Sequence, residues 1–395
     1  MIFWESKYDG DIMKALIYDK VKQPWDRSRG FEMVDIPEPK LDEKKNPEDA
    51  LSVIIKLRYA GVCGSDRNLW YRTGFKEMVH ESLAHEGKSS RITGHEFLGE
   101  IVQEGSMVKR LYRDHDPKNR AKVQVGALVS GDSHITCGRC YQCRLGESHV
   151  CLNEAILGIT IDGIFAEYAK IPAKNLWAVD TTRLRPEIAA MYDPFGNAIH
   201  AATIVDMRGQ RVAIFGCGPV GLFSILLARN FGAAKIIAVD INPANLKMAK
   251  KLGAHEVAHA DEAVARINEL TYGKGVDIAM EMAGPPASLN NCIESTRRGG
   301  HVIVFGIKDG DFTISRFSRL IVVRGLTLHG IIGRQIFRTW QIAQRVLNDK
   351  TNGVQDAIWN VILKKGTGTI LPFKKFTPKS FEKSMSENPK ILFKF

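Results

Sequence analysis

From about residue 185 onward, short apolar runs alternate with helical stretches, and this alternation limits the possible folds more than any other feature. The apolar runs have the length and composition of buried strands. Strands that alternate with helices predict a parallel sheet covered by helices on both faces. The predicted strands are Arg211–Phe215, Lys235–Val239, Val276–Met280, His301–Phe305 and Leu326–Ile332, and the predicted helices are Pro219–Phe231, Asn245–Leu252, a stretch around 286–297 and Trp340–Leu347.

A glycine-rich turn, Gly-Cys-Gly-Pro-Val-Gly, joins the first of these strands to the first helix. Such a turn lets the backbone approach a pyrophosphate, and the helix N-terminus supplies free N–H groups. Asp240 ends the next strand, where a carboxylate binds the adenine ribose and repels a 2′-phosphate, which favours NAD over NADP. The alternatives are a turn without a ligand and a solvated acid at a strand end. The expected cofactor-binding residues are Gly216, Gly218, Pro219, Val220, Gly221 and Asp240.

The rest of the chain is predicted to form a β-rich domain that the nucleotide-binding domain interrupts. A length of 395 residues exceeds one ordinary domain. Ile12–Tyr18 and Leu51–Tyr59 read as strands, and the strand-like end Ile391–Phe395 is expected to rejoin this first domain. We therefore expect one domain over residues 1–180, a second over 181–338, and a return to the first over 339–395. The polar segments 77–92 and 109–122 are interpreted as surface insertions.

Composition excludes several classes of protein. No stretch reaches the roughly 20 apolar residues of a membrane span, and the first residues lack the apolar core of a signal peptide. The formal net charge of +11 is spread without a long basic run, so neither nucleic acid nor a membrane is an expected partner. We expect a cytoplasmic protein, in which clustered cysteines indicate metal binding or catalysis before disulfides.

Four cysteines lie close together in the sequence and predict a structural metal site. Cys137, Cys140 and Cys143 follow one another at steps of three, and Cys151 comes eight residues later. Four thiolates suit a tetrahedral Zn²⁺ and leave no open position. The alternatives are an iron–sulfur cluster, which also takes four cysteines, and free thiols in a loop.

Cys63, His95 and Glu96 are candidate ligands of a second, catalytic zinc. A thiolate, an imidazole and a carboxylate from separate loops can hold zinc with one position open. An open zinc lowers the pKa of a bound alcohol, and a nearby nicotinamide can then accept a hydride from its carbon. Taken singly, these residues could be a buried small hydrophobe, a loop histidine and a surface acid. The nucleotide motif makes the zinc interpretation the stronger one.

The chain resembles the zinc-dependent medium-chain dehydrogenase/reductase family from about Met13 to its end, apart from the two insertions. Within that family it is most similar to the threonine dehydrogenases. The stretches that carry the resemblance are Gly131-Asp-Ser-His134-Ile-Thr-Cys137-Gly, Asp193-Pro-Phe-Gly-Asn-Ala-Ile-His200, and Gly330-Ile-Ile-Gly333-Arg334 followed by Thr339-Trp340.

The resemblance implies an α/β fold, with a GroES-like β-rich catalytic domain and a Rossmann domain whose doubly wound parallel sheet binds NAD. It implies two zinc ions per chain, one catalytic and one structural, and a homo-oligomer, either a dimer or a tetramer. It also implies that Asp193 can approach the catalytic zinc, that Ser65 starts the proton relay, and that His134 helps to select the substrate. The implied reaction is the oxidation of L-threonine to 2-amino-3-oxobutanoate.

Several positions depart from the family pattern. Asn68 stands where the proton relay usually continues to a histidine, so we expect the proton to leave through water or through His80 or His85 of the insertion 77–92. Asn245 stands where a basic residue often follows the acid of the adenosine site; it remains a candidate cofactor contact, and NAD preference then rests mainly on Asp240. Arg334 is interpreted equally as a substrate or cofactor contact and as a structural salt bridge.

Two other functions stay open. The two insertions flank the expected substrate entrance, which makes a polyol, cyclitol or sugar, as in sorbitol dehydrogenase, the alternative substrate. A non-catalytic nucleotide-binding relative would have lost a metal ligand, and the set of ligands in this sequence is complete.

Overall fold

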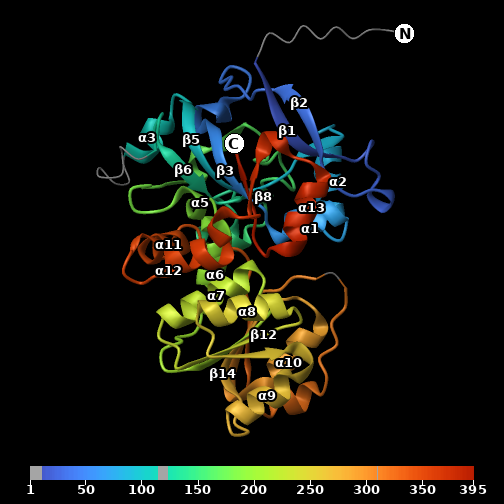
Figure 1. The fold of residues 1–395 in the computed structure, drawn as a ribbon. Coiled ribbons are helices and arrows are strands. Elements are labelled where there is room, and N and C mark those ends of the chain that lie inside the picture. Colours follow the sequence, from blue (N-terminus) through green and yellow to red (C-terminus); the bar gives the residue numbers. More distant parts are fainter. Residues whose placement is uncertain (1–10, 114–122, 309) are drawn as a thin grey trace.

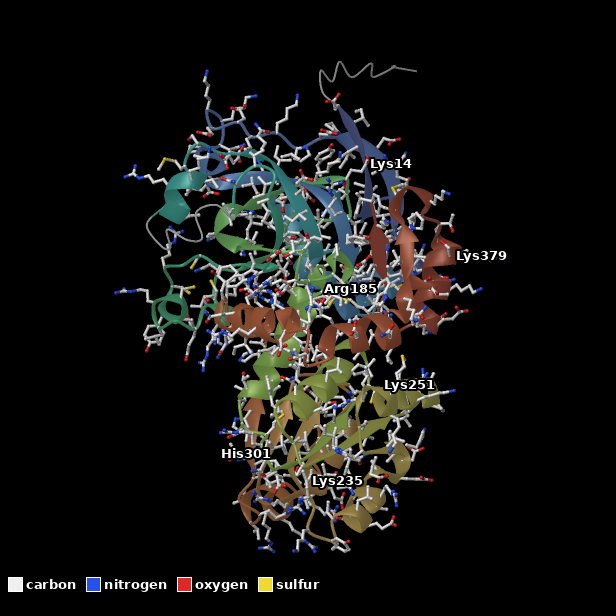
Figure 2. All side chains as sticks on the ribbon, turned by 60° about the vertical axis from the view of Figure 1, so that its left-hand side comes forward. Lys14, Arg185, Lys235, Lys251, His301 and Lys379 are labelled. Carbon is white, nitrogen blue, oxygen red and sulfur yellow. The ribbon has the colours of Figure 1, made fainter. Side chains whose placement is uncertain are left out.

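The computed structural model describes residues 11–113, 123–308 and 310–395, which form two lobes (Figure 1). The first part of the chain builds the upper lobe, the middle part builds the lower lobe, and the last part returns to the upper lobe. Among the helices of the described residues, none is both long and apolar enough to cross a lipid bilayer. Figure 2 shows Lys14, Lys235, Lys251 and Lys379 at separate places on the two lobes.

The lower lobe contains a six-stranded parallel sheet in the order β13-β12-β11-β14-β15-β16. Val212 and Ile214 point to one face and join the cluster that includes α7 and α8. Their neighbours Ala213 and Phe215 point to the other face and pack with α9 and α10. The predicted doubly wound sheet is therefore confirmed. Its strands are β11 (Arg211–Phe215), β12 (Lys235–Asp240), β13 (Glu256–His259), β14 (Val276–Glu281), β15 (Thr296–Val304) and β16 (Thr327–Gly330), and its helices are α7 (Pro219–Asn230), α8 (Pro243–Leu252), α9 (Ala263–Leu270) and α10 (Pro286–Ser295).

The upper lobe is built from β-sheets. Its main sheet has the order β10-β6-β5-β3-β18-β17, with β9 also paired to β3, and a three-stranded sheet, β2-β1-β4, lies beside it. The strands are β1 (Ile12–Asp19), β2 (Glu32–Pro37), β3 (Ser52–Gly61), β4 (Ser90–Ile92), β5 (Glu96–Glu104), β6 (Leu128–Gly131), β9 (Tyr168–Pro172), β10 (Leu176–Ala178), β17 (Ile370–Pro372) and β18 (Leu392–Lys394), and a small separate sheet pairs β7 (His134–Ile135) with β8 (Ala155–Ile156). The helices here are α1 (Gly64–Tyr71), α2 (Lys76–His85), α3 (Val108–Arg113) and α4 (Tyr141–Arg144).

The C-terminal segment returns to the upper lobe as predicted. Strand β18 runs antiparallel to β3, with Phe393 opposite Ala60. We propose that residues 1–180 and 339–395 form one domain and residues 181–338 the other. The remaining helices are α5 (Pro186–Ala189), α6 (Tyr192–Thr203), α11 (Arg338–Asn348), α12 (Val354–Ala357) and α13 (Pro378–Glu387).

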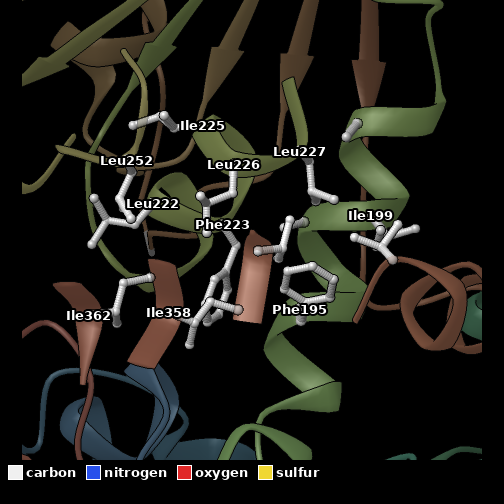
Figure 3. Packing of buried hydrophobic residues seen from close by; sticks show 14 of the residues in the cluster. Phe195, Ile199, Leu222, Phe223, Ile225, Leu226, Leu227, Leu252, Ile358 and Ile362 are labelled. Carbon is white, nitrogen blue, oxygen red and sulfur yellow. The ribbon is translucent and has the colours of Figure 1, made fainter. Parts of the chain in front are cut away.

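A large apolar cluster holds the two lobes together where α6 and α7 meet (Figure 3). Phe195 of α6 and Phe223 of α7 are both buried, and their rings meet edge to face with centroids 5.3 Å apart. Ile358 and Ile362, which follow α12, pack against the same cluster. Each fully buried side chain of this size contributes about 1.5–3 kcal/mol, so the junction between the lobes is a well-packed core.

Residues 77–92 do not form the surface insertion that the sequence suggested. They form most of α2 and then β4, which pairs with β1. Val79 and Leu83, one helical turn apart, are both buried, and so is Arg91, which binds Glu86 and Asp162. Two apolar residues in a charged stretch are too weak a pattern to reveal a core helix. Of the other segment, residues 109–113 belong to α3 and residues 114–122 lie outside the described residues.

Candidate active site and metal sites

Cys63, His95 and Glu96 come together in the upper lobe. Their ligand atoms all lie within 4.8 Å of one another. Cys63 follows β3 and caps the N-terminus of α1, while Glu96 begins β5 directly after His95. Since β3 and β5 are paired with Gly61 opposite Glu96, the sheet register itself brings the three side chains to one place.

Asp66 orients this cluster. Its carboxylate is buried, accepts the Cys63 backbone N–H at 2.8 Å, and lies 3.8 Å from His95 Nδ1. Burial raises the pKa of Asp66. Burial alone would lower the pKa of His95, but the charges of Asp66 and Cys63 outweigh it and raise that pKa to about 10. A histidine that faces both a thiolate and a carboxylate is suited to a shared cation.

The donor set fits a zinc ion. Nδ1 of His95 and Oε1 of Glu96 are both buried and have no hydrogen-bond partner within the part of the chain that the structure describes. Buried polar atoms are seldom left without a partner. A thiolate and an imidazole beside a carboxylate are ligands that suit Zn²⁺. The other carboxylate oxygen of Glu96 is bound by Lys390, and burial raises the pKa of this acid.

Asp193 lies beside this cluster and is bound by Arg334. Its charge acts on both His95 and Glu96, but its carboxylate does not belong to the group of ligand atoms within 4.8 Å. Arg334 Nη1 donates to Asp193 Oδ1 at 2.9 Å. In this conformation Asp193 is therefore a neighbour of the candidate metal site.

Arg334 forms a buried salt bridge between distant parts of the chain. It is 3% exposed, and it binds Asp132 through Nε at 2.9 Å and Nη2 at 2.7 Å. It also donates to Asp193, Ser133 and Asn197, so each of its five N–H groups has an acceptor. Of the two interpretations of Arg334, this geometry supports the structural one.

A cavity of about 790 Å³ opens between the lobes beside Cys63 and His95. Residues of both lobes line it, including Ser65 and Asn68 of α1, and Ala283 and Phe305 of the lower lobe. The hydroxyl of Ser65 is buried without a hydrogen-bond partner among the described residues. Asn68 accepts a hydrogen bond from Thr73 at 3.2 Å. The cavity could hold a small alcohol next to the candidate zinc ligands.

His134 and Glu154 share one wall of this cavity, where Nδ1 of His134 lies 2.7 Å from Oε2 of Glu154. The two histidines expected in the proton path do not line the cavity. Nε2 of His80 is hydrogen-bonded to Tyr18 at 2.8 Å, and His85 is exposed at the end of α2. The expected route through these histidines is therefore wrong, because α2 turns His80 toward Tyr18, while the expected route through water stays a prediction.

The glycine turn lies at the carboxyl end of β11, next to the cavity. Gly216 has a φ of +96°, and a Cβ on it would meet Ala283, which lines the cavity. A Cβ on Gly221 would lie 1.8 Å from the carbonyl oxygen of Gly216, whereas one on Gly218 would meet no atom within 4 Å. Two glycines thus close the turn, and the third leaves the open space that a pyrophosphate needs. Pro219 and Val220 start α7 there.

Asp240 ends β12 beside this turn. Its Oδ2 accepts the backbone N–H of Cys217 at 2.6 Å and lies 3.5 Å from Nδ2 of Asn245, while Oδ1 accepts the Asn242 N–H at 2.7 Å. The carboxylate is half-buried and fixed at the edge of the sheet. These contacts place an acid where the adenine ribose of a dinucleotide would lie.

Cys137, Cys140, Cys143 and Cys151 also come together, with their sulfurs within 4.8 Å of one another. Sγ of Cys151 lies 3.6 Å from that of Cys137 and 3.8 Å from that of Cys140. A tetrahedral ion with Zn–S bonds of about 2.3 Å separates its sulfurs by about 3.8 Å, whereas a disulfide would need about 2.05 Å. Backbone N–H groups of Arg139 and Cys140 lower the pKa of the Cys137 thiol to about 6, which favours the thiolate that a metal binds.

Sequence reasoning missed three residues of the site. Asp66 follows Cys63 by three positions, and an acid at the third position of a helix is a capping signal that could have been noticed. Lys390 and Glu154 are single charged residues far from their partners in sequence, and no local pattern marks them.

Fold and site together define a zinc-dependent oxidoreductase with a dinucleotide-binding domain. Residues 49–181 match the alcohol dehydrogenase GroES-like domain, and residues 219–349 match the zinc-binding dehydrogenase domain. The chain belongs to the zinc-dependent medium-chain dehydrogenase/reductase family, as its resemblance to that family implied.

Within this family the chain is similar to L-threonine 3-dehydrogenases. The enzyme of Bacillus licheniformis is 34% identical over 352 residues, which are 89% of this chain and 92% of that enzyme. The enzyme of Pyrococcus horikoshii is 34% identical over 80% of this chain and 82% of its own length. Among solved structures, 2R,3R-butanediol dehydrogenase from Bacillus subtilis shares the fold with a TM-score of 0.76 at 24% identity, covering 97% of this chain and 99% of its own.

Proposed function

We propose that the protein oxidises a secondary alcohol to a ketone and transfers the hydride to NAD, with L-threonine as the preferred substrate and 2-amino-3-oxobutanoate as the product. The main support for this proposal is the cavity between the lobes. Cys63 and His95 line it from one lobe, and Ala283, which lies beside the glycine turn, lines it from the other. The threonine preference is supported by relatives that are 34% identical over most of their length.

Cys63, His95 and Glu96 are proposed to hold the catalytic zinc, with Asp193 able to approach it. When bound, zinc would lower the pKa of the substrate alcohol, and the nicotinamide of NAD would accept the hydride. Ser65 lies on the cavity wall, its hydroxyl has no hydrogen-bond partner among the described residues, and it is proposed to take up the alcohol proton and pass it toward solvent. Asn68 cannot carry a proton onward near neutral pH, so water completes the path.

The glycine turn with Asp240 is the proposed site of the cofactor, and the four clustered cysteines are the proposed site of a second metal ion. Asp240 is proposed to bind the adenine ribose and to exclude the 2′-phosphate of NADP, with Asn245 at its side. Cys137, Cys140, Cys143 and Cys151 are proposed to hold a structural zinc, which gives two zinc ions per chain. We also propose a homo-oligomer, which light scattering of the purified protein would test.

A polyol or sugar remains the second candidate substrate. The cavity of about 790 Å³ is large enough for a chain longer than threonine, and residues of α2 lie at its edge. The test is a panel of L-threonine, sorbitol, butane-2,3-diol and an inositol, each assayed with NAD and with NADP by the absorbance of the reduced nicotinamide. Reduction of NAD that is fastest with L-threonine supports the proposal. Activity with polyols alone would favour a polyol as the substrate. Activity with none of these alcohols would overturn both candidate functions.

A further inference from the structure

We propose that Glu154, together with His134, binds a positively charged amino group on the carbon next to the reacting alcohol. The proposal rests on the proposed function and names its substrate class: the enzyme prefers amino alcohols to uncharged diols. It is carried by the chemistry of one wall of the cavity.

The position of Glu154 is fixed by its neighbours. It directly precedes β8, which pairs with β7 through Ile156 and His134, so the two side chains meet across this small sheet. His134 Nδ1 and Glu154 Oε2 are 2.7 Å apart, and their side chains are 14% and 26% exposed. Asn175 donates to the carbonyl of His134 at 2.8 Å, which holds the strand in place. The pair is therefore a rigid part of the cavity wall.

Glu154 decides which hydrogen bonds this wall can make. A carboxylate only accepts, so Nδ1 of His134 must carry the hydrogen, and Nε2 of a neutral His134 is then an acceptor. Nε2 lies toward Gly333, another residue of the cavity, since a Cβ on Gly333 would come within 3.9 Å of it. Both residues thus offer acceptors to the cavity, and an ammonium group supplies the matching donors.

Among the described residues that line the cavity, the lysine and arginine side chains are those of Lys308 and Arg334. The five N–H groups of Arg334 are taken up by the acceptors described above. Lys308 lines the cavity from the lower lobe and is exposed. The carboxylate of an amino acid could lie toward Lys308 while its ammonium group lies against Glu154. A negatively charged group placed against Glu154 would be repelled.

The experiment compares two alcohols that differ in a single group: 1-aminopropan-2-ol, which carries an ammonium, and propane-1,2-diol, which carries a hydroxyl. For the wild-type protein we expect a higher kcat/KM with the amino alcohol. Glu154→Gln keeps the shape of the side chain and removes its charge. It should lower the ratio of kcat/KM for the amino alcohol to kcat/KM for the diol by about 10- to 100-fold, as expected for the loss of a charge-assisted hydrogen bond. Glu147→Gln removes an exposed carboxylate outside this cavity and should leave the ratio unchanged.

Titration calorimetry of both alcohols, in the presence of NADH, measures binding without turnover. Tighter binding of the amino alcohol by the wild type, lost in Glu154→Gln and kept in Glu147→Gln, supports the inference even if neither alcohol is oxidised. Equal binding of the two alcohols by the wild type, or a preference that survives in Glu154→Gln, would overturn the inference. If the inference fails in this way but the protein still oxidises alcohols with NAD, the proposed function remains supported.

Discussion

Glu96 and Lys390 form a completely buried ion pair, although they are 294 positions apart in the chain. Both side chains have no exposure to solvent, and the ammonium of Lys390 also donates to the carbonyl of Val62 at 2.9 Å. Lys390 lies two residues before β18, so the C-terminal return delivers a cation to a candidate zinc ligand.

Lys390→Met is expected to lower the free energy of unfolding by about 3–5 kcal/mol, because it leaves the carboxylate of Glu96 buried without its cation. Urea unfolding measures the change. The double variant Glu96→Gln with Lys390→Met removes both charges and should recover part of the loss. A loss below about 1 kcal/mol, typical of an exposed pair, would contradict the burial of this one.

Arg334→Met is expected to destabilise the protein by a similar amount, about 3–5 kcal/mol, since Asp132 and Asp193 would remain buried without a partner. Arg208→Met is the matched control. Arg208 binds Asp206 at the surface, where solvent screening leaves such a pair little effect on stability. Equal losses in the two variants would show that the Arg334 cluster is open to water.

The ionised carboxylate of Asp277 stabilises the fold, and we expect this part of the free energy of unfolding to be lost in acid. Burial alone would raise the pKa of Asp277, but hydrogen bonds from Arg211 and Arg297 outweigh it and lower the pKa to about 2. The folded state thus holds the carboxylate charged more strongly than the unfolded chain does. The contribution, about 2 kcal/mol, is complete above pH 4 and disappears as the pH falls toward 2.

The test compares urea unfolding of the wild type with that of Asp277→Asn between pH 7 and pH 3. The difference in the free energy of unfolding should be constant down to about pH 4 and should shrink below it. A difference that does not change with pH would mean that the charge of Asp277 contributes nothing.

Asp240→Ala is expected to change the choice of cofactor. Removal of the carboxylate takes away both the ribose contact and the repulsion of a 2′-phosphate, so kcat/KM should fall with NAD and rise with NADP. Because Asp240 also accepts the Cys217 N–H, Asp240→Asn, which keeps an acceptor there, separates the loss of charge from damage to the turn. An unchanged ratio of NAD to NADP activity in both variants would contradict the assignment.

Local patterns in the sequence predicted most of the strands and helices of the lower lobe. The strand Arg211–Phe215 and the C-terminal end of α8 at Leu252 lie where they were predicted, because strand and helix periodicity act over a few residues. Strand β13 and helix α9 were missed: Glu256–His259 is short and only partly buried, and it stays in the sheet by pairing with β12.

Two of the residues that support the site could not be predicted from the sequence. Cys63 and His95 carry recognisable chemistry, and so they could be nominated without a structure. Lys390 and Glu154 act only through partners brought near by the sheets, and a single lysine or glutamate gives no sign of its burial or its contact. Sequence therefore indicates the reactive groups, while the packing around them decides their orientation and charge.

The zinc content of the chain and the formation of NADH together test whether Cys63 holds a catalytic zinc. Mass spectrometry would measure the number of zinc ions per chain in the wild type and in Cys63→Ala, alongside NADH formation. Cys143→Ala, which removes one of the four cysteines of the proposed structural zinc site, is the control for a lost structural ion. We expect two zinc ions in the wild type and one in Cys63→Ala, with NADH formation lost in that variant. Two ions retained in Cys63→Ala, or NADH formation at the wild-type rate, would contradict this expectation.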